Sequence, residues 1–552
     1  MKTHWLVASI FVLIAIFLAL LAPDIAKPVA AQSPGVHGPF VGPPVIPMSF
    51  DGDVRRLPLA QVAQRETPRF RLSRPAQVTP PISADPVRQT RSGSVRMPAP
   101  LQNFKGLDRP TWSTSFPPDP NGDVGPNHYI ETVNIAIGIF SKTGTQLWAF
   151  TYNTFFSGAP GPCGSNGNRG DVIVLYDATV NRWIISDFAW LDIDTGPYYE
   201  CIAVSKSDDP VSGGWWLYAL QADANYLNDY PKLGVWRDGI YMSANLFDAY
   251  GGGTGYNWQG VKVWALNRDE LINGLPLNPV SFLLSPALGY INLLPSNFRG
   301  SPPPAGTPNL FGSIESPNKF FIWKFHVDWN TPTNSTFTGP TNVTVANFAM
   351  PCNAAWDINC VPQLNGESVD GLGDRLMMQL QYRNISGVES LWVNHTVANS
   401  TAVGDPTGVR WYEIRDPNGT PTVYQQGTYQ PDSNYRWMGS LAVDRFGDMA
   451  LGYSVSSASM YPAIRYAGRL EDDPPGTLPQ GETSLTEGTG SQSGGYNRWG
   501  DYSAMSVDPN DDCTFWYVNQ YYETTGGNWQ TRIGSFKFPV CKSRYFFPLI
   551  FK

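Results

Sequence analysis

The chain of 552 residues contains 53 Gly, 49 Pro, 13% aromatic residues and only 15% charged residues, with a formal net charge of −8. So many aromatic residues with so few charges exclude a generally disordered chain, and the lack of a Gly-x-y period in the sequence excludes collagen. Frequent turn residues between aromatic and β-branched runs predict an all-β chain, long enough for two to four domains.

The first predicted element is a secretory signal over residues 1–31. Lys2 supplies a positive start, residues 6–22 form an uninterrupted apolar run, and residues 29–31 give the small-residue pattern of a cleavage site. An uncleaved anchor is the alternative, because the apolar run lies at the short end of membrane-spanning lengths. We therefore expect a secreted or cell-surface protein without a membrane span after signal cleavage.

The next segment, 32–109, is Pro-rich and has no sustained period of 2 or 3.6, which predicts a linker or an extended arm wrapped on the following domain. Residues 33–110 hold eleven Lys or Arg against five Asp or Glu, a net charge of +6, whereas residues 111–552 have a net charge of −15. An acidic main body excludes a nucleic-acid partner, which needs a basic face.

The six cysteines are an even number in a chain expected to be exported, which predicts disulfides. Six cysteines allow fifteen connectivities, but order along the chain favours three local pairs. These pairs are Cys163 with Cys201, Cys352 with Cys360, and Cys513 with Cys541.

One unit recurs from residue 110 to residue 541: a polar turn, a short apolar strand, another turn, and a strand rich in Trp, Tyr and Val. The turn markers are Gly122-Asp123, Gly170-Asp171, Asn228-Asp229, Gly312-Ser313, Gly373-Asp374, Gly439-Ser440 and Gly500-Asp501. Spacings of roughly 50 to 60 residues have the size of propeller blades. The spacing predicts a β-propeller of seven blades, or six if one unit is an elaboration. A large β-sandwich with long insertions is the alternative, and it leaves the regular spacing unexplained.

Three segments, 229–243, 436–444 and 498–509, resemble innermost strands of secreted bacterial β-propeller proteins of the sialidase-like, Asp-box-related group, most of them functionally uncharacterised. The resemblance covers residues 110–540 as a pattern and is specific in these three motifs. It implies six or seven blades with a site at one end of the central channel. The strict Asp box and the Arg-Ile-Pro segment of true sialidases are missing from the sequence, which favours a binding protein over a sialidase.

Three arginines, Arg375, Arg436 and Arg498, are separated by one repeat length each. That spacing predicts that they converge at the channel mouth, where planar guanidinium groups would bind a carboxylate or sulfate. The resemblance implies the same, because sialidases hold the carboxylate of their substrate in this way. The alternative is that each arginine pairs with an aspartate of a neighbouring blade, such as Asp374, Asp444 or Asp501.

Trp437 and Trp499 directly follow two of these arginines. If their rings are exposed at the channel mouth, they are expected to stack on sugar rings and belong to the ligand site. If they are buried, they pack between blades, which is the commoner place for such a side chain.

Aspartates recur at the starts of the predicted units, which predicts several carboxylates around one channel end. Such carboxylates serve acid and base roles in glycoside hydrolysis, and the catalytic candidates are Asp123 or Asp229 as acid and Tyr502, beside Asp501, as nucleophile. The alternating oxygens of Asp119, Asn121 and Asp123 suggest a structural calcium turn or simple turn capping, and no other cofactor is expected.

Two functions follow from these patterns. The first is a secreted propeller that binds a glycan or a surface protein at its channel face without catalysis. The second is a sialidase-like glycoside hydrolase that uses the channel-mouth arginines and carboxylates. The apolar segment 542–552 is expected to be either a closing strand or a surface-retention tail.

Overall fold

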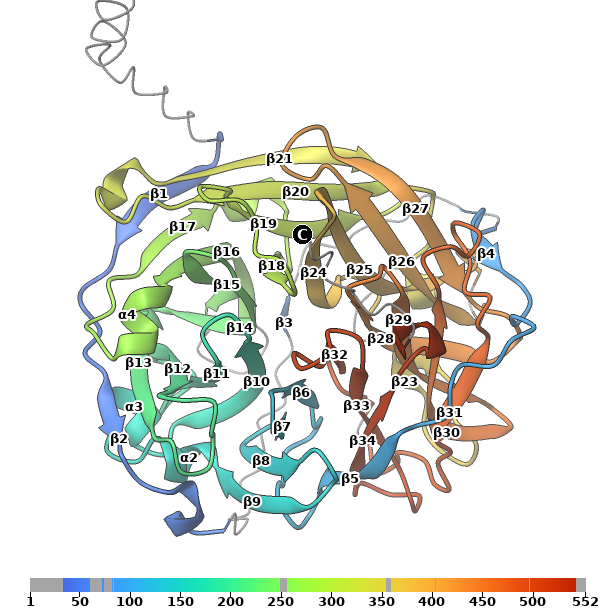
Figure 1. The fold of residues 1–552 in the computed structure, drawn as a ribbon, viewed down its shortest axis with the longest axis horizontal. Helices are drawn as coiled ribbons and strands as arrows, with labels where there is room; N and C mark the ends of the chain where they lie inside the picture. The colour runs from blue at the N-terminus through green and yellow to red at the C-terminus, as the bar shows by residue number, and fades with distance from the viewer. Residues whose placement is uncertain are drawn as a thin grey trace, which may run out of the picture.

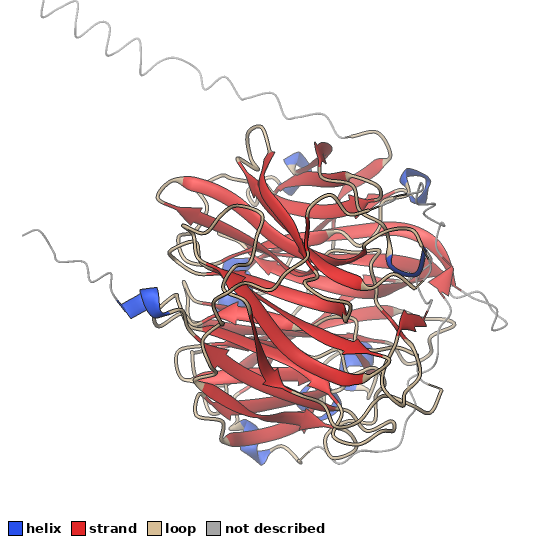
Figure 2. Ribbon diagram, turned by 90° about the vertical axis from the view of Figure 1, so that its right-hand side faces the viewer, coloured by secondary structure: helices blue, strands red, loops and turns tan. Residues whose placement is uncertain are grey.

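The computed structural model describes residues 33–59, 72–73, 82, 84–248, 256–353, 359–402, 404–495 and 497–542. The predicted signal segment lies outside these residues, as does the predicted C-terminal tail apart from Lys542. The sheets are arranged around a central axis (Figure 1), which is the architecture of a β-propeller. Figure 2 shows that strands dominate and that the helices are short.

Three of the sheets contain four strands each. One consists of β6 (Asn121–Val124), β7 (His128–Val133), β8 (Ala136–Ser141) and β9 (Gln146–Thr151). Another consists of β28 (Tyr435–Val443), β29 (Met449–Ser457), β30 (Met460–Arg469) and β31 (Glu482–Thr486). The third consists of β32 (Ala504–Val507), β33 (Phe515–Tyr521), β34 (Gln530–Phe536) and, at its edge, β5 (Gln102–Asp108).

Two sheets consist of four consecutive strands extended by residues from the N-terminal segment. The first has the order β10 (Asn168–Asp177), β11 (Arg182–Ala189), β12 (Tyr198–Ser205), β13 (Trp215–Asp223) and β2 (Met48–Phe50). The second has the order β14 (Tyr226–Val235), β15 (Gly239–Asp248), β16 (Tyr256–Asn267), β17 (Val280–Leu284) and β1 (Val36–Val41), with β3 (Leu72–Ser73) beside β16.

The largest sheet has nine strands because two antiparallel units share it. One unit is β21 (Thr336–Thr344), β20 (Lys319–His326), β19 (Asn309–Glu315) and β18 (Leu294–Phe298). The other is β24 (Met377–Ile385), β25 (Val388–Ala398), β26 (Thr407–Arg415) and β27 (Thr422–Tyr429), followed by β4 (Arg88–Gln89). The units join through the parallel pair β18 and β24. A small sheet pairs β22 (Asn359–Val361) with β23 (Val369–Asp370).

The helices lie in the connections. They are α2 (Tyr152–Phe155), α3 (Gly161–Gly164) and α4 (Arg268–Asn273), with 3₁₀ turns η1 (Val54–Arg56), η2 (Pro286–Leu288), η3 (Pro332–Asn334), η4 (Pro351–Asn353) and η5 (Pro539–Lys542). Within the described residues, no helix is long and apolar enough to cross a membrane.

The first strand of each unit lies nearest the central axis (Figure 1), and side chains of these innermost strands bond the backbone of the next unit. The Asn121 side chain accepts the Val174 N–H at 3.0 Å, Gln381 accepts the Val443 N–H at 2.6 Å, and Ser440 accepts the Met505 N–H at 2.9 Å. Buried polar groups need such partners. Neighbouring units are therefore held together by hydrogen bonds as well as by apolar packing.

The N-terminal segment runs along the rim of the molecule (Figure 1), where β1, β2, β4 and β5 each add an edge strand to a sheet. The pairing of β5 with β34 brings the last strand of the N-terminal segment and the last strand of the described chain into one sheet. All three disulfides predicted from the order of the cysteines are confirmed: Cys163–Cys201, Cys352–Cys360 and Cys513–Cys541.

One repeat marker is displaced from its expected place. Gly312-Ser313 lies in β19, the second strand of its unit, whereas the innermost strand β18 carries no Gly-Asp pair. The spacing of 83 residues before this marker therefore combines one whole unit with the first strand of the next.

Candidate functional site at one end of the innermost strands

A polar cluster lies where several innermost strands begin. Because neighbouring innermost strands run in the same direction, their first residues meet at one end of the central axis. We call this group of side chains the channel-end cluster: Asp119, Asp171, Tyr230, Lys232, Arg375, Arg498, Asp501 and Tyr502.

Local bulges direct two of these residues into the cluster. Asp171 and Tyr230 have φ of 50° and 55°, and the strand register shifts next to each of them. A bulge with positive φ is costly for a non-glycine residue and changes where its side chain points. Here it lets the Asp171 carboxylate accept the Tyr230 N–H at 3.0 Å, which links β10 to β14.

Two of the three predicted arginines come together on one carboxylate. Arg375 donates to Asp374 at 2.7 Å and has a terminal nitrogen 4.0 Å from Asp501, while Arg498 donates directly to Asp501. The Arg375 guanidinium also lies 4.5 Å from the centre of the Tyr230 ring. Both arginines are therefore engaged by aspartates, but the direct partner of each lies in its own unit and not in a neighbouring unit, as the alternative to anion binding supposed.

Arg436 does not belong to this cluster, which corrects the predicted convergence of three arginines. Its fully buried guanidinium pairs with Asp432 at 2.7 Å and with Glu482 at 3.0 Å, beside the rings of Tyr429 and Tyr453. The reason is local, because Arg436 lies next to the carboxylates of its own unit.

The cluster contains a buried lysine that the sequence did not single out. Lys232 donates to the Pro231 carbonyl at 2.9 Å, and its ammonium lies 3.4 Å from the centre of the Tyr230 ring and 4.2 Å from that of Tyr502. Burial lowers the pKa of Lys232 to about 8, although the charges of nearby aspartates favour its protonated form. The only sequence signal was its place inside an apolar strand of the motif 229–243.

The acids of the cluster differ in protonation. Burial, reinforced by the charge of Asp501, raises the pKa of Asp119 to about 7, and burial together with Asp229 raises the pKa of Asp171 well above its usual range. Burial also acts on Asp501, but the charges of Arg498, Arg375 and Lys232 outweigh it and hold the pKa of Asp501 below its usual value. The surroundings of these carboxyl groups therefore separate their pKa values, raising those of Asp119 and Asp171 and lowering that of Asp501.

Tyr502 and Asp501, two of the predicted catalytic candidates, both lie in the cluster. Tyr502 is buried, and its hydroxyl donates to the Val172 carbonyl at 2.9 Å. Asp229 acts electrostatically on Asp171 and raises its pKa. The roles proposed for these residues in catalysis stay predictions.

Asp123 lies apart from the cluster. Its carboxylate accepts the Tyr176 N–H at 2.7 Å and pairs with Arg299, which corrects its predicted place beside the other unit-start aspartates. Asn121 accepts from Val174, and Asp119 accepts the Asp501 N–H at 2.7 Å and the Asn134 amide at 2.9 Å. Since all three side chains are committed to protein donors, calcium binding here stays a prediction that receives no support from this arrangement.

Trp437 and Trp499 are fully buried, which corrects their assignment to a sugar-stacking surface. Their ring centres are 5.6 Å apart at 67°, and the Trp499 indole donates to Ser454 at 3.1 Å. Edge-to-face packing of this kind joins the unit of β28 to the unit of β32.

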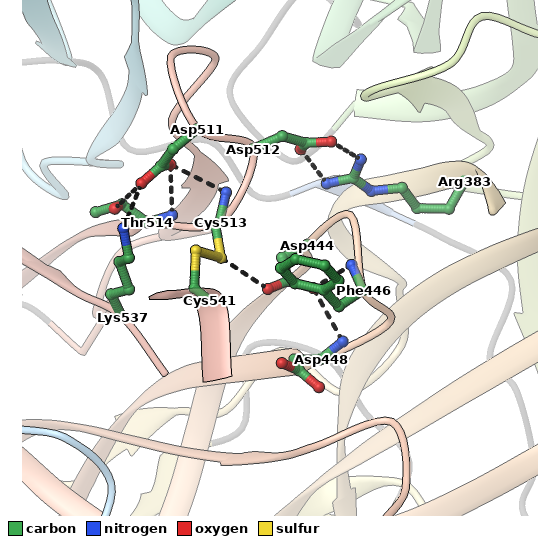
Figure 3. The surroundings of a disulfide bond; sticks show 10 residues. All are labelled: Arg383, Asp444, Phe446, Asp448, Asp511, Asp512, Cys513, Thr514, Lys537 and Cys541. Atoms are coloured by element: carbon green, nitrogen blue, oxygen red, sulfur yellow. Dashed lines mark hydrogen bonds and ion pairs between the residues drawn. A yellow bond between two sulfur atoms is a disulfide. The ribbon is translucent and has the colours of Figure 1, made fainter. Parts of the chain in front are cut away.

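The opposite ends of the innermost strands carry structural ion pairs. Figure 3 shows Arg383 of β24 bonded to both oxygens of Asp512, near the Cys513–Cys541 disulfide. Asp444, a predicted arginine partner, lies beside the Cys513 sulfur at 3.4 Å instead (Figure 3), and burial raises its pKa to about 8. Arginines at this end link one unit to another rather than facing a ligand.

Glu200 of β12 is a buried acid that accepts from Asn228 of β14, and we expect it to make the stability of the protein depend on pH in an unusual way. Burial raises the pKa of Glu200 to about 8, so the native state keeps a proton that the unfolded chain releases above its ordinary pKa of 4.5. Stability is therefore complete at low pH and falls by about 1.4 kcal/mol per pH unit for this group as the pH rises toward 8. Glu200→Gln should flatten the fall in Tm between about pH 5 and about pH 8.

The control for this measurement is Glu487→Gln, because Glu487 pairs with Arg465 with half of its side chain exposed. Its pH profile should follow that of the wild type. Parallel profiles of wild type and Glu200→Gln would show that Glu200 is ionised in the native protein.

Comparison with known proteins gives matches among solved structures alone: no family model and no curated protein matches the chain. A Hadza microbial sialidase is 13% identical with a TM-score of 0.35, covering 77% of this chain, which spans 66% of that protein. An α-L-arabinanase of Penicillium chrysogenum complexed with arabinobiose is 10% identical with a TM-score of 0.35, covering 70% and 99% of the two chains. A Dyadobacter fermentans protein of unknown function is 12% identical with a TM-score of 0.34, covering 67% and 94%. At these TM-scores the likeness supports no conclusion about activity.

Proposed function

We propose that the protein is a secreted seven-bladed β-propeller that binds glycans at the channel-end cluster without cleaving them. The seven blades are the seven units that begin with β6, β10, β14, β18, β24, β28 and β32, and β5 closes the ring by pairing with β34. Three disulfides fit the oxidising environment outside the cytoplasm.

The observation that carries this proposal is the shared engagement of Arg375 and Arg498 by Asp501. It fixes guanidinium donors and carboxylate acceptors in a charge-balanced network, which suits the hydroxyl groups of a sugar better than a free anion. The Arg498 side chain is 31% exposed, against 11% for Asp501 and 2% for Arg375. Arg498 is therefore the donor of this network that a ligand reaches most easily.

A second candidate function, glycoside hydrolysis, is favoured by one specific observation. Asp119 and Asp171 have raised pKa values close to an Asp501 whose pKa is lowered. Carboxyl groups whose environments separate their pKa values are the usual acid and base of glycosidases.

A glycan array with the purified protein tests the first function, and a panel of fluorogenic glycosides tests the second. We expect binding to at least one glycan that falls by at least about tenfold in Arg498→Ala, since a hydrogen bond from a charged donor is lost. Arg532→Ala is the control, because Arg532 lies in β34 and bonds Asn103 at the surface. If the protein hydrolyses a glycoside and Asp501→Asn abolishes this activity, the second function replaces the first. If Arg498→Ala binds glycans as tightly as the wild type, the proposed site is wrong.

A further inference from the structure

A separate cavity lies between β24–β27 and the loops that follow β28 and β30. Its volume is 360 Å³, within the range of pockets that hold small molecules. Residues from β26 and β27 form one side, and the β28–β29 turn, which carries Phe446 (Figure 3), and the segment after β30 form the other. We call it the inter-unit pocket.

Arg469 is one of the residues that line this pocket, although it is only 2% exposed. One terminal nitrogen donates to the carbonyls of Glu471 and Asp473, at 3.2 and 2.7 Å. Its Nε has no hydrogen-bond partner among the residues that the structure describes. Buried donors are normally paired, so this unpaired N–H leaves Arg469 with a donor that is free to bond an acceptor from a ligand.

An aromatic wall faces solvent in the same pocket. Tyr424 is 50% exposed, and the Arg415 guanidinium lies 3.2 Å from the centre of its ring. Arg415 in turn donates to Glu413 at 2.5 Å, and the second oxygen of Glu413 accepts the Gln425 amide at 2.5 Å. Arg415 and Glu413 are thus committed to each other, and the Arg415 guanidinium packs on the Tyr424 ring.

The charges around the pocket favour a neutral ligand over an anion. Carboxylates of Glu413, Glu471, Asp448 and Asp473 all act electrostatically on Arg469. A carboxylate or sulfate ligand would be repelled by these four groups, whereas a hydroxyl oxygen can accept from Arg469 without that cost. An exposed aromatic ring beside buried polar donors matches a molecule with one apolar face and several hydroxyl groups.

We propose that the inter-unit pocket is a second binding site, for a neutral saccharide residue whose hydroxyl accepts from Arg469 and whose apolar face packs on Tyr424. This site shares no residue with the channel-end cluster, so its proposal is tested independently of the function proposed for that cluster.

Saturation-transfer NMR and calorimetry on the full chain test this site with a panel of neutral monosaccharides and disaccharides and, separately, of sugar acids. At least one neutral saccharide should bind, and its affinity should fall by at least about tenfold in Tyr424→Ala and in Arg469→Gln. Because Tyr424 is half exposed, its variant should keep the wild-type Tm. The controls are Arg532→Gln and Arg498→Ala, in which binding to this pocket should stay within about twofold of the wild-type affinity.

Three results would overturn the proposal: no neutral saccharide binds, binding is retained in Tyr424→Ala, or sugar acids bind more tightly than neutral sugars. Loss of binding in Arg498→Ala but not in Tyr424→Ala would assign the bound sugar to the channel-end cluster and leave the inter-unit pocket without a ligand. Such a result would support the function proposed for that cluster and refute this second site.

Discussion

Asp501→Asn lowers the free energy of unfolding by about 3 to 5 kcal/mol, the usual effect of removing one partner from a buried ion pair. Asp501 accepts from Arg498, lies 4.0 Å from Arg375 and is stabilised as an anion by both arginines and by Lys232. Its removal leaves the guanidinium of Arg375, which is 2% exposed, beside Asp374 and the Tyr230 ring without the charge of Asp501. Urea and thermal unfolding would measure the loss.

Two further variants separate the loss of a charge partner from a general loss of packing. Glu487→Gln removes a carboxylate from a surface pair and should cost no more than about 1 kcal/mol. The double variant Asp501→Asn with Arg498→Met should be more stable than Asp501→Asn, because it removes the uncompensated guanidinium as well. If Asp501→Asn costs no more than Glu487→Gln, the arginines of the cluster do not depend on this carboxylate.

The sequence predicted the all-β architecture because turn residues recur at roughly regular intervals between aromatic strands. It missed β18 because the segment Leu294–Phe298 carries no Gly-Asp marker and holds its place through parallel pairing with β24, a contact between distant parts of the chain. Local patterns report hairpins well and do not report such pairings.

Only part of the candidate site was predicted from the sequence, and the rest was missed for a similar reason. Arg375 follows its marker Gly373 by two residues, whereas Arg498 precedes Gly500 by two and Arg436 precedes Gly439 by three. Nearly equal spacing between the arginines therefore concealed unequal positions within the repeat. In strands, a shift of one residue reverses the face to which a side chain points, and bulges shift it again. Burial of Trp437 and the pKa of Lys232 depend on neighbouring units, which periodicity along the chain does not describe.

The N-terminal segment is predicted to be held on the molecule by one buried ion pair. Arg410 of β26 is fully buried and donates to Asp85 at 2.7 Å, and Thr428 of β27 donates to the other Asp85 oxygen at 2.6 Å. Two of the remaining guanidinium donors reach the carbonyls of Ala346 and Asn347. Asp85 thus neutralises a charge buried between two units, although it precedes Arg410 by 325 residues.

Asp85→Ala should therefore lower the free energy of unfolding by about 3 to 5 kcal/mol and make the segment around residue 85 sensitive to proteases. Asp51→Ala is the matched control in the same N-terminal segment, because Asp51 pairs with Lys206 while its side chain is 76% exposed, and such surface pairs contribute little to stability. Equal stability and equal proteolysis of the two variants would show that the segment is held by its edge strands alone. A large loss confined to Asp85→Ala would show that an acidic residue in a basic, Pro-rich segment fixes that segment to the sheets.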